Sequence, residues 1–596
     1  MIDLGILLRV PCIEVEMGFD ISPDGEKVAY SWNPDGHWEI YELYLRGQAN
    51  PQLISRGSGG KFHPQYSPDG RYLAFAVDFD GSENFHIFIH DFTDGRQREL
   101  APEMNCDHQA YFAWAPDSKR IAFISDQTGQ FNVYVIPIQG GKERLVMDAG
   151  HPAWKVRWSP DGSMLAVTIE AGGIDYGTFV VPLKGGTVVQ ISDEQGPIDA
   201  GQACWSPDSK HLAFSSDTHG FNNIGIYEVS TRGIIWLTDG EGEKQFPCWS
   251  PDGKLLAYVF NRGTVSWLAL QKLGEAPELY QVEPGVHYWP EFTPDGQTLI
   301  FCFDNPRHPD DLWSLRLADG QFTQLTSSLP EELAIAPFIM PEEITYPGLD
   351  GTPIPALLFV PPGQKPAPAV IIIHGGPDWL FEMTWYPLMA SMASRGWVVM
   401  APNYRGSTGY GRAWQAASRF DFGGVDTDDV TAGALYLIRL GLANKLRIGI
   451  TGRSHGGYLT ASCMTRYPEL WAAGSAVVPF LNWFTNHKEI RPDLQHWDIE
   501  NFGDPVENDK RWHDHSPSFY LDRINAPLQL ICGGSDVRCP VSDSIEARDR
   551  LQEMGKVVDF ILYENEGHIF LNMEKVIDSE TRRIDFLAKY LEGNQS

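Results

Sequence analysis

The sequence predicts two domains, a seven-bladed β-propeller followed by a doubly wound α/β domain with a mostly parallel sheet. A turn motif recurs at a near-constant period through the first half of the chain, and after about residue 341 short apolar runs alternate with helical segments. The 596 residues are too many for one domain of ~100–200 residues. We therefore expect an N-terminal segment at 1–15, the propeller at 16–335 and the α/β domain at 336–596.

The repeated motif is an aromatic or apolar residue, then Ser, Thr or Ala, then Pro-Asp-Gly or Pro-Asp-Ser. Its prolines are residues 23, 68, 116, 160, 207, 251 and 294, at steps of 45, 48, 44, 47, 44 and 43 residues. Pro presets φ, Asp bonds the backbone locally and Gly accepts a positive φ, so each copy is a tight turn. Strands with a period of two follow, as in Tyr72–Ala76 and Leu255–Val259, which excludes a helical solenoid. Several short strands in each of seven repeats predict seven blades.

The apolar runs of the second half predict buried parallel strands separated by helices. The strands are expected at Ala369–Ile373, Trp397–Met400, Arg447–Ile450, Leu528–Cys532 and Phe560–Tyr563, and the helices at Val425–Leu440, Tyr458–Tyr467, Asp543–Met554 and Lys575–Leu591. Ligands of such sheets bind where the strands end, at their carboxyl edge.

Charge and cysteine content narrow the function. Lys and Arg number 46 and Asp and Glu 78, a net charge of −32, which repels phosphate backbones and anionic lipid, so we expect neither nucleic acid nor membrane as a partner. The eight cysteines lack paired spacing, and no metal or other cofactor is expected. The N-terminus lacks a basic region before its short apolar run, so the cytoplasm is the expected compartment.

One strand end carries a nucleophile motif. Gly452-x-Ser454-x-Gly456 lies between an apolar strand and a helix, as in the nucleophile elbow of the α/β-hydrolase fold. The glycines are expected because the sharp turn leaves no room for Cβ atoms near Ser454. The alternative is an ordinary Gly/Ser turn without a catalytic role, and the strand before the motif and the helix after it argue against this alternative.

A nucleophilic serine needs a base, and the base needs an acid to orient it. In this fold the acid and then the base follow the serine in the chain. Asp536 and His568 each follow a predicted strand, so they are the expected acid and base. His455 directly follows the nucleophile and should point away, and the 512–515 cluster precedes a Ser-Pro turn.

The oxyanion hole needs two N–H groups. One is expected from the backbone of His455, and the second from the loop after the strand at 369–373. Gly376 is our choice for that second donor, with Gly375 as the alternative. Tyr404, in a loop after another strand, either lines the site wall or stabilises a turn.

These motifs resemble the prolyl oligopeptidase family of serine peptidases, and within it the acylaminoacyl-peptidase-like branch. The runs that carry the resemblance are 374–377, 403–411, 422–426, 452–458, 536–540 and 566–568. The resemblance implies that Arg538, two residues after the acid, holds a substrate main-chain carbonyl. An Arg that only stabilises the loop by an ion pair is the alternative. Asp426, Asp428 and Asp429 also match the family and are interpreted as structural.

The predicted function is a serine peptidase that cleaves short peptides, including N-acylated ones, with an apolar pocket at Phe480 and Trp483. Dipeptidyl-peptidase relatives carry a Glu pair in a propeller insertion, whereas Glu331-Glu332 lies here after the last repeat, so aminodipeptidase activity is not expected.

A carboxylesterase with the same triad and a propeller-borne binding protein with an inert hydrolase are the two rival functions. The propeller is expected to limit the size of the substrate, and residues 1–15 are expected to pack on the hydrolase domain. The sequence does not fix the oligomeric state, and a homo-oligomer remains an alternative to a monomer.

Overall fold

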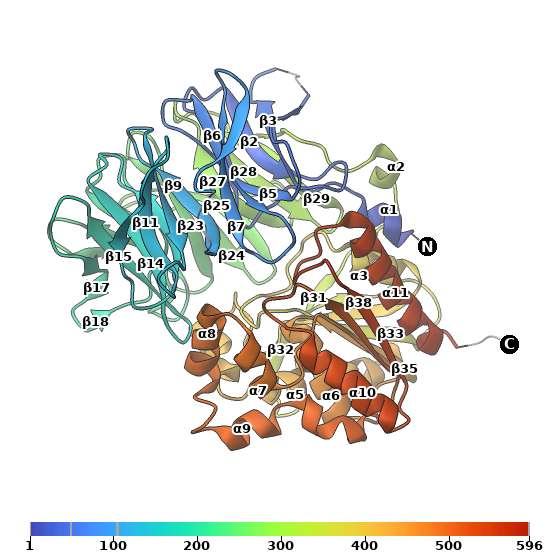
Figure 1. The fold of residues 1–596 in the computed structure, drawn as a ribbon. Helices are drawn as coiled ribbons and strands as arrows, with labels where there is room; N and C mark the ends of the chain where they lie inside the picture. Colours follow the sequence, from blue (N-terminus) through green and yellow to red (C-terminus); the bar gives the residue numbers. More distant parts are fainter. Residues whose placement is uncertain (1, 48–49, 103–105, 594–596) are drawn as a thin grey trace. The chain divides into compact units, whose positions relative to one another are not determined.

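The computed structural model describes residues 2–47, 50–102 and 106–593. It divides into two compact units, one formed by residues 11–79 and 83–329 and the other by 1–10, 80–82 and 330–596. Figure 1 colours the first unit blue to green and the second mainly yellow to red.

The first unit is a propeller of seven four-stranded antiparallel sheets, as predicted, and each blade is built from one continuous stretch of chain. The strands of blades 1 to 3 are β1 (Phe19–Ile21), β2 (Lys27–Trp32), β3 (Glu39–Tyr44), β4 (Gln52–Leu53), β5 (Gly60–Tyr66), β6 (Tyr72–Asp78), β7 (Phe85–Asp91), β8 (Arg96–Glu99), β9 (His108–Trp114), β10 (Arg120–Ser125), β11 (Asn132–Pro137) and β12 (Arg144–Met147). Those of blades 4 to 7 are β13 (Ala153–Trp158), β14 (Met164–Gly172), β15 (Asp175–Pro182), β16 (Val189–Gln190), β19 (Gly201–Trp205), β20 (His211–Ser216), β21 (Asn223–Glu228), β22 (Ile234–Trp236), β23 (Glu243–Trp249), β24 (Leu255–Arg262), β25 (Val265–Lys272), β26 (Glu278–Tyr280), β27 (Val286–Phe292), β28 (Thr298–Asn305), β29 (His308–Arg316) and β30 (Gln321–Gln324). A small hairpin, β17 (Ser192–Asp193) and β18 (Gly196–Pro197), precedes blade 5.

The repeated Pro-Asp turn joins the first two strands of each blade. Its last residue is left-handed, with φ between 68° and 72° at the five glycines of the motif, such as Gly296 and Gly253. In the other two blades Ser118 and Ser209 adopt the same conformation at φ 57° and 60°. A positive φ is what the turn requires, which explains why glycine predominates there.

The first strands of neighbouring blades contact one another and are therefore the innermost strands of the propeller. Large side chains recur on them three residues before the aromatic residue of the turn motif. These residues are His63, Tyr111, Lys155, Gln202, Phe246 and Trp289.

The segment Val15–Met17 is held by three of these side chains. The Trp289 indole N–H donates to the Val15 carbonyl, the Tyr111 hydroxyl to Glu16 O at 3.0 Å, and His63 Nδ1 to Met17 O at 2.8 Å. The segment thus contacts the innermost strands of blades 2, 3 and 7.

The second unit contains an eight-stranded sheet in the order β31-β32-β34-β33-β35-β36-β37-β38. Its strands are β31 (Glu342–Pro347), β32 (Pro353–Phe359), β33 (Ala367–Ile373), β34 (Val398–Pro402), β35 (Ala443–Arg453), β36 (Ala473–Val477), β37 (Leu528–Gly533) and β38 (Val558–Tyr563). From β34 through β38 the pairing is parallel, whereas β31 and β32 pair antiparallel.

Helices cover both faces of this sheet, which makes the unit doubly wound as predicted. The helices of this unit are α1 (Leu4–Leu8), α2 (Glu331–Ala334), α3 (Pro387–Ser394), α4 (Arg412–Gln415), α5 (Val425–Arg439), α6 (His455–Arg466), α7 (Trp483–Glu489), α8 (Pro492–Phe502), α9 (Asp509–Asp514), α10 (Ser542–Glu553) and α11 (Met573–Leu591), with 3₁₀ turns at Ala416–Ser418 and Pro517–Arg523. Alternate residues of β33 explain the two layers. Ile371 and Ile373 pack in the core with α5, α6 and α10, whereas Val370 and Ile372 pack in the core with α3 and α11.

The N-terminal residues of the described chain lie against this second unit. Leu4 of α1 is buried in the core formed with α3 and α11. The Ile2 N–H donates to Ser394 Oγ at 2.8 Å, and Arg9 pairs with Glu574 at 2.7 Å.

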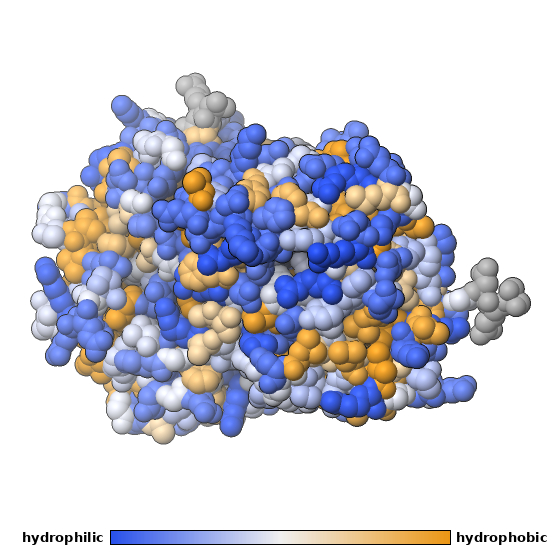
Figure 2. Space-filling view, turned by 90° about the horizontal axis from the view of Figure 1, so that it is seen from below, coloured by the Kyte–Doolittle hydropathy of each residue, from blue (hydrophilic) through white to orange (hydrophobic). Residues whose placement is uncertain are grey.

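Hydrophilic and hydrophobic residues are interspersed over the face drawn in Figure 2. Among the described residues, no helix combines the length and the apolar character needed to cross a membrane.

Candidate active site

Ser454 occupies a sharp turn between β35 and α6. Its φ of 59° and ψ of −125° lie in a region that L-residues rarely adopt. A Cβ on Gly452 would lie 2.3 Å from Gly456 O, and one on Gly456 would lie 2.3 Å from Ile373 O. The tight packing of strand, turn and helix therefore requires both glycines, as expected for a nucleophile elbow.

Asp536 and His568 lie in the loops that follow β37 and β38. His568 Nδ1 is 2.8 Å from Asp536 Oδ2 and 3.0 Å from Asp536 Oδ1. Asp536 Oδ1 also accepts the backbone N–H groups of Arg538 at 2.9 Å and Cys539 at 2.8 Å. Both side chains are buried, so this charge-assisted contact is shielded from water. A donor at Nδ1 leaves Nε2 of a neutral His568 as an acceptor.

Arg453 is a supporting residue whose role was not predicted from the sequence. Its guanidinium donates to the backbone carbonyl of His568 and lies over the Phe570 ring. It thereby links the residue before Ser454 to the loop that carries His568. Arg453 occupies a variable position of the Gly-x-Ser-x-Gly motif. The only signal in the sequence that could have predicted its role is a positive charge next to the nucleophile.

The loop after β33 approaches the nucleophile. A Cβ on Gly375 would lie 3.3 Å from Ser454 Cβ, and Gly376 has a φ of 112°. His374 supports the loop through Nδ1 to Gly375 O at 2.7 Å and Nε2 to Ser407 Oγ at 2.8 Å. Burial lowers the pKa of His374 to about 3, so this imidazole is neutral. Both candidate oxyanion glycines thus belong to a loop fixed beside Ser454.

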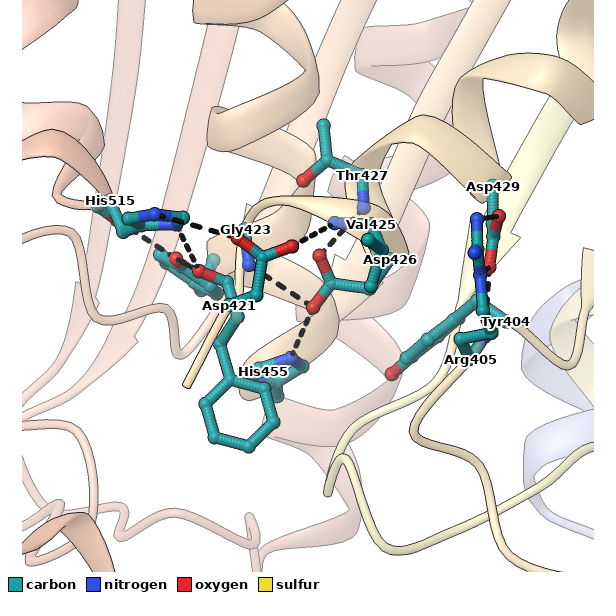
Figure 3. Close-up of polar contacts among 12 residues, drawn as sticks. Tyr404, Arg405, Asp421, Gly423, Val425, Asp426, Thr427, Asp429, His455 and His515 are labelled. Carbon is teal, nitrogen blue, oxygen red and sulfur yellow. Dashed lines mark hydrogen bonds and ion pairs between the residues drawn. The ribbon is translucent and has the colours of Figure 1, made fainter. Parts of the chain in front are cut away.

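The side chain of His455 points into a buried cluster (Figure 3). Its Nε2 lies 3.5 Å from Asp426 Oδ2, and both side chains are almost fully buried. The Asp426 carboxylate also accepts the N–H groups of Gly423 at 3.1 Å and Thr427 at 2.7 Å. The imidazole therefore lies beside Asp426 in the buried cluster, while the backbone of His455 begins helix α6 next to Ser454.

The predicted pocket residues differ in exposure. Trp483 is 1% exposed and donates through Nε1 to Tyr458 Oη at 3.2 Å, whereas Phe480 keeps 7% and stacks on Tyr458. Tyr404 is fully buried, stacks on His374 and donates to His374 O at 3.0 Å. Trp483 and Tyr404 thus lie within the packed core of the unit. Arg538 is exposed in the loop that begins with Asp536.

A group of acidic side chains lies apart from these residues, in the propeller. Oxygen atoms of Asp175, Asp199 and Asp217 lie within 4.8 Å of one another. Asp199 accepts the backbone N–H groups of Tyr176 at 2.9 Å and Asp217 at 3.2 Å, so backbone donors already satisfy part of this group.

Comparison with known proteins relates both domains of the chain to known families. Residues 385–594 match the prolyl oligopeptidase family, and residues 12–156 match the TolB beta propeller domain. The chain is 25% identical to the protein named uncharacterized peptidase YuxL of Bacillus subtilis, with 85% of this chain and 93% of that protein aligned. It is 24% identical to the acylamino-acid-releasing enzyme of Mus musculus, over 83% of this chain and 67% of that enzyme.

Among solved structures, a puromycin-hydrolyzing peptidase of Mycobacterium tuberculosis superposes with a TM-score of 0.87 at 19% identity, covering 99% of this chain and 96% of that one. The family match and the relatives named peptidases define the class of the protein as a serine-type peptidase. Its catalytic domain belongs to the prolyl oligopeptidase family, and the domain before it is a β-propeller.

Proposed function

We propose that Ser454, His568 and Asp536 form a catalytic triad that hydrolyses short peptides, including N-acylated ones. The observation that carries the proposal is the 2.8 Å contact between His568 Nδ1 and Asp536 Oδ2, at the same sheet edge as the strained turn of Ser454. The name of the mouse relative, an acylamino-acid-releasing enzyme, supports the N-acylated substrates.

The proposed reaction needs no cofactor. Ser454 Oγ attacks the scissile carbonyl while His568 Nε2 takes its proton, and His568 then protonates the leaving amine. Asp536 fixes the tautomer of the neutral His568 imidazole and stabilises the imidazolium that forms when it takes the proton. The His455 N–H and the Gly376 N–H, with Gly375 as the alternative, are proposed to bind the oxyanion. Water then hydrolyses the acyl-enzyme by the same steps.

Two measurements test this function. A fluorophosphonate probe should label Ser454 and abolish hydrolysis, which would exclude an inert hydrolase domain. A panel of N-acylated peptides, free-amine peptides and simple esters should show turnover of the acylated peptides. Labelling of Ser454 combined with failure on every peptide and acyl amide would favour the carboxylesterase.

We propose that Arg538 holds a main-chain carbonyl of the substrate, because a guanidinium carries a permanent charge and forked donors. Arg538→Ala should lower kcat/KM for a peptide, because the loss of a charge-assisted hydrogen bond raises the free energy of the transition state by roughly 1.5–3 kcal/mol. Turnover of a simple aryl ester should change much less. Arg439→Ala, an exposed position at the end of α5, is the matched control. Equal losses on both substrates would identify Arg538 as structural.

For the acyl-side pocket we propose Phe480 as the wall that meets the substrate. Trp483 supports it from the core at a ring distance of 4.8 Å, and Tyr404 acts through the His374 loop. This division is consistent with the greater exposure of Phe480, at 7% against 1% for Trp483 and 0% for Tyr404.

We propose that the propeller limits substrate size. The large side chains on its innermost strands and the Val15–Met17 segment bound to them support this, because they narrow the space around the propeller axis. A cleavable sequence should be hydrolysed efficiently as a short peptide and hardly at all inside an intact folded protein or a long unfolded chain. Efficient cleavage in the unfolded chain would eliminate the size limit.

We further propose a cytoplasmic location, which is consistent with eight cysteines that are all free thiols.

A further inference from the structure

A buried carboxylate lies beside the side chain of a proposed oxyanion donor. His455 begins helix α6, and its backbone N–H is one of the two groups proposed to bind the oxyanion. The Nε2 atom of its imidazole is 3.5 Å from Asp426 Oδ2 (Figure 3). Asp426 is 0% exposed and His455 is 2% exposed, so this ion-pair contact is shielded from solvent.

Backbone groups at the start of α5 hold the Asp426 carboxylate in place. Its Oδ2 accepts the Gly423 N–H at 3.1 Å, and its Oδ1 accepts the Thr427 N–H at 2.7 Å. Both donors lie at the N-terminus of the helix, where the backbone dipoles favour a negative charge. The carboxylate next to His455 is therefore fixed by α5 and independent of the imidazole for its position.

The other two carboxylates in the first turns of α5 have different partners. Asp429 pairs with Arg405 at 2.6 Å, and Asp428 lies 3.7 Å from Arg466. In the described part of the chain, the one ion pair of Asp426 is with the imidazole. Removal of the Asp426 charge therefore changes the surroundings of the imidazole, whereas removal of either of the others changes an arginine contact.

Aromatic rings enclose the imidazole on its other sides. Four ring centroids lie between 5.2 and 6.4 Å from that of His455, namely those of Tyr458, Phe422, Phe480 and Tyr404. Nε2 makes no hydrogen bond to the described residues, so the nearby carboxylate is the charged group that compensates its polarity. A side chain packed in this way turns little, and its position also restrains its own backbone.

We propose that Asp426 is a positioning residue of the oxyanion hole. Its carboxylate fixes the His455 imidazole, and with it the direction of the His455 N–H toward the oxyanion. A hydrogen bond weakens with distance and steeply with angle, so a displaced N–H stabilises the transition state less and leaves binding of the substrate unchanged. The inference rests on the proposed function, because the oxyanion forms only in that reaction.

The experiment compares Asp426→Asn with wild type on an N-acylated peptide. Asparagine keeps the size of the side chain and an oxygen for the backbone donors, and removes the charge. Loss of an entire oxyanion donor costs about 10²–10³-fold in kcat, so a misplaced one should lower kcat by roughly tenfold or more, with KM close to that of wild type. The Ki of a peptide aldehyde, which forms a hemiacetal with Ser454, should rise by the same factor.

Asp428→Asn, on the same helix, is the matched control and should keep kcat and Ki near those of wild type. Circular dichroism and Tm show whether each variant is folded. Unchanged kcat and Ki in folded Asp426→Asn, or a rise in KM with kcat unchanged, would overturn the positioning role.

A second variant tests the same contact from its other side. His455→Phe keeps the backbone N–H and an aromatic ring but removes Nε2, so its kcat should also fall. Adding Asp426→Asn to His455→Phe should cause little further loss, because both changes remove one contact. Full activity of His455→Phe, or losses that multiply in the double variant, would overturn the proposal. Failure of the wild type to hydrolyse the peptide would instead contradict the proposed function.

Discussion

Replacing Ser454 with alanine is expected to abolish peptide hydrolysis, by on the order of 10⁴-fold or more, without unfolding the protein. Ser454 lies at a turn that is shaped by Gly452 and Gly456, so loss of its hydroxyl removes the covalent route and little packing. Without the nucleophile, only the oxyanion donors and substrate binding remain to accelerate the reaction.

Hydrolysis of an acylated peptide, measured beside circular dichroism and Tm, tests this expectation. Ser542→Ala, at a half-buried serine at the start of α10 whose hydroxyl donates to Glu489, should keep activity near that of wild type. The variant Ser454→Ala should also resist labelling by a fluorophosphonate. Turnover near that of wild type in folded Ser454→Ala would mean that another residue is the nucleophile.

The substitution Asp536→Asn should lower kcat by roughly 10⁴-fold. Oδ1 of Asp536 accepts two backbone N–H groups, so the asparagine oxygen is expected to stay there and its amide to face His568. That amide donates where the carboxylate accepted, which forces a hydrogen onto Nε2 of His568. The histidine can then no longer take the proton of Ser454.

Single-turnover kinetics with an activated ester and a peptide would measure the loss at the acylation step. Asp543→Asn is the matched control, because Asp543 is also buried and accepts two backbone N–H groups, from Leu481 at 2.6 Å and Asn482 at 3.0 Å. It contacts no proposed catalytic residue, so its activity should fall far less. Similar losses in the two variants would point to loop destabilisation instead of a tautomer effect.

The seven blades could be predicted because their turn needs a particular chemistry at every copy. Only glycine and a few polar residues tolerate the left-handed position, so Gly25 and Ser118 mark equivalent turns despite different sequences. The loops of Asp536 and His568 could be located for a similar reason, because buried parallel strands have continuous apolar sequences whose ends are easy to recognise.

The antiparallel strands β31 and β32 were not predicted. They contain Pro347, Pro353 and Pro355, and proline argues against a strand assignment in a sequence. Asp426 was interpreted only as a structural carboxylate, because its contact with His455 joins residues that are far apart in the chain. The burial of Trp483 likewise depends on aromatic neighbours from α8 and α9, which no local pattern encodes.

Because each blade is a continuous stretch of chain, the sheets formed by the described residues exchange no strand between the first blade and the last. Among the described residues, this boundary includes a hydrogen bond from Ile13 N to Asp310 O and an apolar cluster that joins Tyr30 and Phe19 to Ile300 and Leu312. The strand pairs within a blade are local contacts that form quickly, whereas this boundary joins residues from opposite ends of the domain. During synthesis the blades can therefore fold one after another as an open arc, and closure of the ring waits until the seventh blade has left the ribosome.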